Sequence, residues 1–241
     1  MDQLTPEFLA LGLIWYIVFL FSTTCHEASH ALAAKIGGDL TAFHGGQVTL
    51  NPAPHVQREP FGMVLVPILS YVLGGWMIGW ASAPYDPWWQ ERYPRRAALM
   101  SLAGPAANFT LMIIAAICIR VGIAADVFQP PVTASFGHII DVTNPESASG
   151  VIRFASSFLS VLFFLNLLLG TFNLLPVPPL DGGTAVTLLM SARTALRFLS
   201  FTREPTFQMV GLVASWWLFD KAFDPIFTLA LNVLYPGLGY S

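Results

Sequence analysis

The first hydrophobic segment of this chain reads LALGLIWYIVFLFSTTCHEASHALAA (residues 9–34), and it carries ionisable side chains inside an apolar run. Near its end stands HEASH, residues 26–30, which is an HExxH pattern. Because residues four apart share one face of a helix, His26 and His30 can hold one metal ion, and Glu27 beside them can act as general base. Ionisable groups at membrane depth are costly and are functional candidates by default. The segment therefore predicts a zinc hydrolase site within a membrane helix.

The composition is that of an integral membrane protein. Of the 241 residues, 55% are hydrophobic and 10% are charged, whereas soluble domains carry about 25% charged residues. The net charge is −3 and no basic run is present, so nothing in the sequence indicates a nucleic-acid partner. The two cysteines fall within apolar segments and imply no disulfide framework. We expect the chain to lie in the lipid bilayer.

Five hydrophobic runs indicate a single membrane-embedded domain over residues 1–241. A helix needs about 20 apolar residues to span a bilayer. The runs cover residues 8–35, 61–83, 97–124, 152–175 and 206–235, with polar, proline-rich connectors between them. The expected fold class is an all-α integral membrane protein, a polytopic helical bundle.

The second run, residues 61–83, is expected to re-enter the membrane rather than cross it. If every run crossed, the arginine cluster within residues 92–96 would lie across the membrane from Lys35 and Arg58, which the positive-inside rule disfavours. A bend near Gly74 places these cations on one side. The N-terminus then lies outside, and the HExxH pattern lies toward the cytoplasmic end of the first helix.

Residues 38–51, GDLTAFHGGQVTLN, predict a small membrane-associated β-hairpin. Gly45 and Gly46 suit its turn, and residues 48–50 suit a strand. An exposed strand edge beside a hydrolase site could pair with an extended substrate. An ordinary connector fits the same residues equally well.

Asp181 is the candidate for a third metal ligand, since a catalytic zinc usually takes three protein ligands and leaves one position for water. It stands in NLLPVPPLDGG, residues 173–183, where three prolines stop the preceding apolar helix. Unwound chain at membrane depth must face protein or water, as it does in binding sites near broken helices. Alternatively, Asp181 caps a helix that starts near Thr184. The HExxH pattern in the same chain favours the metal ligand.

With these residues the chain resembles the site-2 protease family of intramembrane zinc metalloproteases, peptidase family M50. The resemblance rests on the HExxH motif together with residues 173–182, which are similar to the family's NxxPxPxxDG element. Two further stretches look similar to family segments, residues 46–52 and 103–109. The matched stretches extend from residue 26 to residue 183.

The resemblance implies that His26, His30 and Asp181 hold one zinc ion per chain and that Glu27 activates a water. It offers Asn173 and Asn108 as residues that hold the substrate or support the site. For a lone membrane asparagine, however, a helix–helix hydrogen bond is the simpler interpretation.

The activity implied by the resemblance is hydrolysis of peptide bonds within or next to a transmembrane segment of a partner protein, near the cytoplasmic side. We expect the compact form of the family, without a PDZ or CBS domain, as a multi-pass protein of a bacterial cytoplasmic membrane.

Two other functions compete with this interpretation. A non-catalytic membrane metal-binding or transport protein would use the same ligands, but it has no need of Glu27 between the two histidines. A zinc protease for soluble peptides, merely anchored in the membrane, would need a sizeable hydrophilic domain. The polar stretches of this chain are too short to build one.

Overall fold

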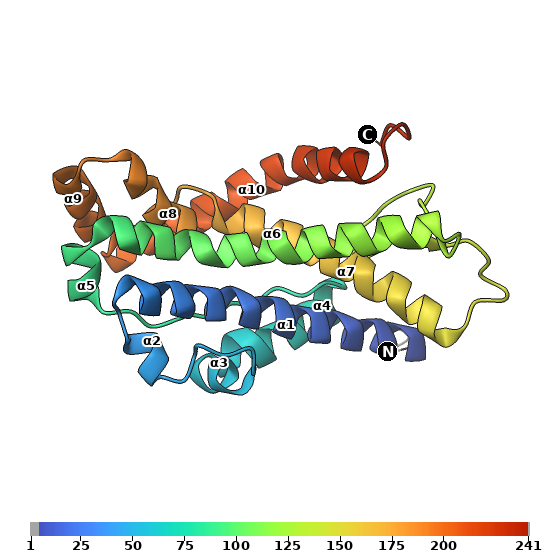
Figure 1. Ribbon diagram of the computed structural model, residues 1–241, viewed down its shortest axis with the longest axis horizontal. Coiled ribbons are helices and arrows are strands. Elements are labelled where there is room, and N and C mark those ends of the chain that lie inside the picture. Colours follow the sequence, from blue (N-terminus) through green and yellow to red (C-terminus); the bar gives the residue numbers. More distant parts are fainter. Residues whose placement is uncertain (1–4, 241) are drawn as a thin grey trace.

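Three long helices organise the computed structural model, which describes residues 5–240 (Figure 1). They are α1 (Pro6–Gly37), α6 (Pro94–Ala124) and α7 (Gly150–Asn173), and within the described residues these three are long and apolar enough to cross a membrane. α1 and α6 lie side by side along the long axis, and α7 packs against both. The predicted class, an all-α integral membrane protein, is confirmed.

Shorter elements connect and flank these helices. They are α2 (Thr41–His44), α3 (Ala53–Arg58), the π-helical turn η1 (Phe61–Leu65), α4 (Val66–Gly74), α5 (Pro87–Arg92), β1 (Phe128–Gln129), β2 (Asp141–Val142), α8 (Asp181–Ala185), the 3-10 turn η2 (Val186–Leu189), α9 (Ala192–Thr202) and α10 (Pro205–Leu234).

The ends of α1 are set by local signals. Thr5 accepts a hydrogen bond from the backbone N–H of Phe8 at 3.2 Å, and Pro6 occupies the first turn, where its missing N–H costs nothing. Gly38 ends the helix in the left-handed region at φ 98°, which glycine adopts without strain. The HExxH motif therefore lies inside one continuous helix, close to its C-terminal end.

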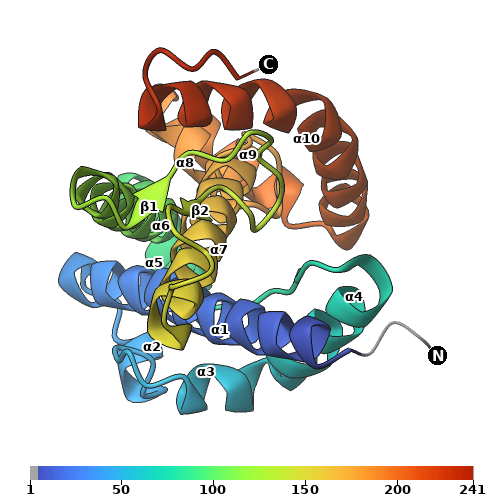
Figure 2. The same cartoon turned by 90° about the vertical axis from the view of Figure 1, so that its right-hand side faces the viewer.

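α10 covers the fifth predicted run, and it is bent. Figure 2 shows the helix changing direction along its length, and Pro225 lies inside it. A proline removes a backbone donor and clashes with the preceding turn, which kinks a helix. Phe223 and Phe227 of α10 pack edge-on against Phe164 of α7, with ring centroids 5.8 and 5.5 Å apart. The bend lets α10 cover the apolar core built by α1, α6 and α7.

The segment after α3 goes into the bundle and comes back. The helical stretch Phe61–Gly74 is shorter than the roughly 20 residues needed to span. Gly75 then turns the chain at φ 76°. On the way back, the N–H of Trp80 donates to Gly62 O at 3.1 Å, and Arg58 donates to Ser82 Oγ at 3.2 Å. The chain thus enters and leaves at the same end of the bundle, as a re-entrant segment does.

The β-hairpin predicted at residues 38–51 was wrong, because this stretch folds as the short helix α2 followed by turns. Asp39 accepts hydrogen bonds from both the N–H and the hydroxyl of Thr41, at 2.9 and 2.6 Å. Such local side-chain bonds compete with strand pairing. Residues 38–51 therefore form an ordinary connector, as the alternative interpretation held. The small antiparallel sheet found in the described residues pairs β1 with β2 instead.

The path of the second run can be tested by cysteine labelling in sealed membranes. In a background lacking Cys25 and Cys118, we expect Gln57→Cys and Tyr85→Cys to react with an impermeant maleimide from the same side. Glu146→Cys, in the connector at the opposite end, should react from the other side. Labelling of Gln57→Cys and Tyr85→Cys from opposite sides would show that residues 61–83 cross the membrane.

Candidate metal centre

Two imidazoles from one face of α1 form the base of the candidate site. His26 and His30 are each 6% exposed, and their Nε2 atoms lie 3.0 Å apart. The four-residue spacing places both rings on the same helix face, as the motif predicts.

Asp181 reaches these nitrogens from a distant part of the sequence. Its Oδ2 lies 3.1 Å from His26 Nε2 and 3.2 Å from His30 Nε2. Asp181 is the first residue of α8, and the N-cap position belongs to Leu180. The carboxylate therefore faces the imidazoles, and it does not cap a helix as the alternative interpretation held.

The loop that carries Asp181 is tightly folded, and two glycines permit this. A side chain at Gly182 would collide with the backbone carbonyls of Leu174 and Leu175, and one at Gly183 would collide with the backbone at Val177 and Pro178. The glycines thus let α8 pack on the end of the chain that leaves α7. This close packing brings Asp181 back toward α1.

The three donor atoms suit zinc. With zinc–ligand distances of about 2.0–2.1 Å, donors at tetrahedral positions lie roughly 3.3 Å apart, and the three atoms here lie 3.0–3.2 Å from one another. Two nitrogen lone pairs and a carboxylate oxygen at such distances repel one another unless a metal ion or a shared proton lies between them. Two histidines and one carboxylate also form a known catalytic zinc set with one open position.

The other ring nitrogen of each histidine is engaged by an acceptor. His26 Nδ1 lies 2.6 Å from Asn108 Oδ1, and His30 Nδ1 lies 2.8 Å from the carbonyl oxygen of Met100. Since these oxygens only accept, both Nδ1 atoms carry the proton and donate it. The Nε2 lone pairs are thereby left free to bind a metal, and α6 fixes the orientation of both rings.

A buried amide chain extends from Asn108 to the other helices. Asn108 Nδ2 donates to Asn166 Oδ1 on α7 at 2.9 Å, and Asn166 Nδ2 donates to Ser22 Oγ on α1 at 2.8 Å. Asn108 and Asn166 are both fully buried. Asn108 thus makes the helix–helix bond expected of a membrane asparagine and also contacts a histidine of the site.

Several members of this arrangement were missed by the sequence interpretation. Asn166 is an isolated amide in the apolar run of α7, which could have marked it. The carbonyl of Met100 carries no sequence signal. Asn173, by contrast, donates its side-chain hydrogen bond to Leu169 O of its own helix, at 3.0 Å. Among the hydrogen bonds of the described residues, none joins the Asn173 side chain to His26, His30 or Asp181.

Glu27 is buried, with 5% of its surface exposed. Within the described residues, no hydrogen bond engages its carboxylate, whereas the Nδ1 atoms of His26 and His30 each have an acceptor. A buried carboxylate without a fixed partner is suited to accept a proton from a water or substrate.

A buried cluster of two histidines and an aspartate, with a free carboxylate beside it and apolar helices around it, defines a membrane-embedded zinc hydrolase. The family model described as "Peptidase family M50" matches residues 14–218. The chain belongs to peptidase family M50, and it is an intramembrane zinc metalloprotease.

Curated relatives carry names that agree with this family. The "Putative zinc metalloprotease YwhC" of Bacillus subtilis is 32% identical over 175 residues, which cover 71% of this chain and 68% of that protein. The protein named Rip2 of Mycolicibacterium smegmatis is 30% identical over 68% of this chain and 52% of its own length. Rip2 of Mycobacterium tuberculosis is 28% identical over 84% of this chain and 71% of its own length. No solved structure matches the chain.

The contribution of Asp181 can be measured as zinc content. We expect about one zinc per wild-type chain and loss of most of it in Asp181→Ala, because two imidazoles alone bind zinc more weakly than three ligands. Atomic absorption on detergent-purified protein gives the ratio. The matched change Glu146→Ala, an exposed acid at the opposite end, should leave zinc unchanged. Equal zinc in both variants would remove Asp181 from the ligand set.

A glycine on α6 makes a second test possible. A side-chain carbon at Gly104 would overlap the Nε2 atoms of both His26 and His30. Gly104→Ala should therefore push the rings apart, at an overpacking cost of about 1–3 kcal/mol, and lower zinc affinity while the helices remain. Gly150→Ala, where no neighbouring atom is in reach, is the matched control. Wild-type zinc affinity in Gly104→Ala would contradict this packing.

Proposed function

We propose that this protein cleaves a transmembrane segment of a membrane-protein substrate, as site-2 proteases do. In this proposal His26, His30 and Asp181 hold the zinc, and Glu27 is the general base. The observation that carries the proposal is the convergence of Asp181 Oδ2 on two imidazole nitrogens at 3.1 and 3.2 Å, beside a buried free carboxylate.

Zinc, when bound, supplies Lewis-acid polarisation of the scissile carbonyl and makes water a stronger acid. Residues of the chain orient the imidazoles and transfer the proton. Asn108 and Met100 hold the two imidazoles in the tautomer that binds metal. Glu27 accepts the proton of the attacking water and then passes it to the leaving amine. Glu27 directly follows His26 on α1, so the proposed base is adjacent in sequence to a proposed ligand.

The substrate segment must lose its helical structure at the site. Peptide groups inside an intact helix are hydrogen-bonded and shielded by side chains, so a water cannot attack them. Unwinding is easiest where glycine or proline already weakens a helix. We therefore expect substrates whose transmembrane segments contain glycine or proline near the cleavage position.

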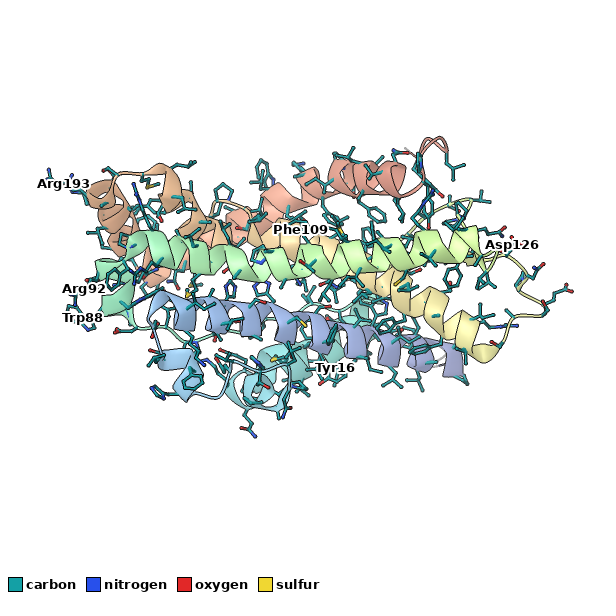
Figure 3. The ribbon with its side chains drawn as sticks, in the orientation of Figure 1. Tyr16, Trp88, Arg92, Phe109, Asp126 and Arg193 are labelled. Atoms are coloured by element: carbon teal, nitrogen blue, oxygen red, sulfur yellow. The ribbon has the colours of Figure 1, made fainter. Side chains whose placement is uncertain are left out.

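Charge distribution supports a cytoplasmic orientation of the site. Figure 3 shows Arg92 and Arg193 at one end of the bundle and Asp126 at the opposite end. The HExxH motif lies in the half of α1 that ends at Gly37, to which Arg96 donates a hydrogen bond. The positive-inside rule assigns the arginine-rich end to the cytoplasm. The bacterial relatives are consistent with a bacterial cytoplasmic membrane.

The variant Glu27→Gln distinguishes a protease from a protein that only binds a metal ion. We expect this variant to keep its zinc and to cleave about 10²–10⁴-fold more slowly, because the amide cannot accept a proton. The assay follows a detergent-solubilised reporter with one apolar segment interrupted by glycine and proline, and removal of zinc by a chelator gives the baseline.

Gln57→Glu, an exchange between the same two residue types on the exposed surface of α3, serves as the control and should cleave at the wild-type rate. If Glu27→Gln cleaves as fast as wild type, another residue is the base. If zinc-loaded wild type cleaves no faster than the chelated protein, the alternative of a metal-binding or transport protein gains support.

A further inference from the structure

A cavity of about 720 Å³ opens between α5 and α9, at the end of the bundle where α1 terminates. It lies apart from the metal cluster, and none of the residues that line it is a proposed ligand or base. Its lining combines arginines from both helices with exposed apolar side chains.

The cavity carries excess positive charge. Three arginines line it, Arg92, Arg197 and Arg203, against one acid, Glu91. Arg203 pairs with Glu91 at 2.8 Å and also donates to Gln90, so these residues join α9 to α5. Within the described part of the chain, no carboxylate pairs with Arg92 or Arg197. Two guanidinium groups therefore face the cavity with their charge uncompensated.

The rim of the cavity has the character of a membrane interface. Trp88 is 78% exposed and Leu196 is 37% exposed, and both line the cavity. Figure 3 shows Trp88 and Arg92 together at this end of the bundle. Tryptophans gather at the headgroup level of a bilayer, and helices that mix arginines with exposed apolar residues lie in that plane.

The ends of the neighbouring long helices indicate the level at which this cavity lies. Trp89 of α5 donates its indole N–H to Gly37 O at the end of α1, at 3.0 Å. α6 begins at Pro94, directly after α5. Two of the helices that can cross a membrane thus end or begin beside the cavity, which places it where lipid headgroups meet the protein.

We propose that this cavity binds the headgroup of an anionic phospholipid. The phosphate would lie between the guanidinium groups of Arg92 and Arg197, which bind phosphate oxygens through paired N–H donors. The acyl chains would lie along Trp88 and Leu196 toward the bilayer. The exposed apolar rim favours a lipid over a free phosphate ion, because an ion gains nothing from apolar contacts.

Such a lipid would also hold in place the chain segment that follows Asp181. α9 follows Asp181 through α8 and η2, and η2 contacts both α8 and α9. A headgroup that bridges α5 and α9 would hold this chain segment against α6. Binding to the folded state alone raises its stability, so anionic lipid should raise the unfolding temperature of the protein.

The test compares lipid retention in variants of the full chain. Wild-type protein is reconstituted in nanodiscs of equal phosphatidylglycerol and phosphatidylcholine, extracted in a neutral detergent, and its bound lipids are counted by native mass spectrometry. We expect retention of phosphatidylglycerol over phosphatidylcholine. In the double variant Arg92→Gln with Arg197→Gln, retention should weaken about 25-fold, since each basic residue near an anionic headgroup is worth roughly fivefold.

Arg193→Gln is the matched control, because Arg193 is exposed on the same helix α9 but does not line the cavity. It should retain phosphatidylglycerol like wild type. Equal weakening in Arg193→Gln and in the double variant would show diffuse attraction instead of a site. Undiminished retention in the double variant would overturn the proposal.

Two further measurements test whether the ligand is a lipid or free phosphate, and whether the double variant is folded. Sodium phosphate should displace no more phosphatidylglycerol than sodium chloride of equal ionic strength does, and stronger displacement would assign the cavity to the free ion. Zinc content and circular dichroism of the double variant should match wild type. If they do not, the single variants Arg92→Gln and Arg197→Gln replace it, each with a loss of about fivefold.

Discussion

Most polar groups buried among apolar helices are hydrogen-bonded, and the arrangement around the metal site depends on such bonds. An unsatisfied buried polar group costs about 1–3 kcal/mol. His26 and His30 are hydrogen-bonded to Asn108 and a backbone carbonyl of α6, and Asn108 is hydrogen-bonded to Asn166 of α7. One set of hydrogen bonds thereby orients the ligands and joins the three long helices. These hydrogen bonds thus tie the proposed metal ligands to the packing of the bundle.

The parts of the site that the sequence predicted are those determined by short-range spacing. The histidine pair follows from helix periodicity, and Asp181 follows from an acid placed at a proline-rich break. The amide chain through Asn166 depends on how α7 is rotated against α6, and Gly104 matters only because α6 lies directly over the imidazoles. Neither rotation nor helix contact can be read from hydropathy.

The sequence predicted the fold to a similar extent as the site. Apolar length identified the spanning helices, and charge distribution suggested that the second run returns to the end where it starts. The hairpin at residues 38–51 failed because β-propensity competes with local hydrogen bonds. Asp39 bonds to Thr41 and to the backbone of Asp86, and it thereby holds α2 against the chain that leads into α5. A contact between distant segments outweighed a local preference.

The absence of a side chain at Gly104 has a geometric consequence for access. α6 comes so close to the two imidazoles that not even a methyl group fits between them. This flank of the site is therefore closed, and an incoming polypeptide cannot reach the nitrogens of His26 and His30 from the side of α6. Asp181 closes the direction from which its own loop arrives. The two closed sides leave fewer directions from which a chain segment can approach the nitrogens of His26 and His30.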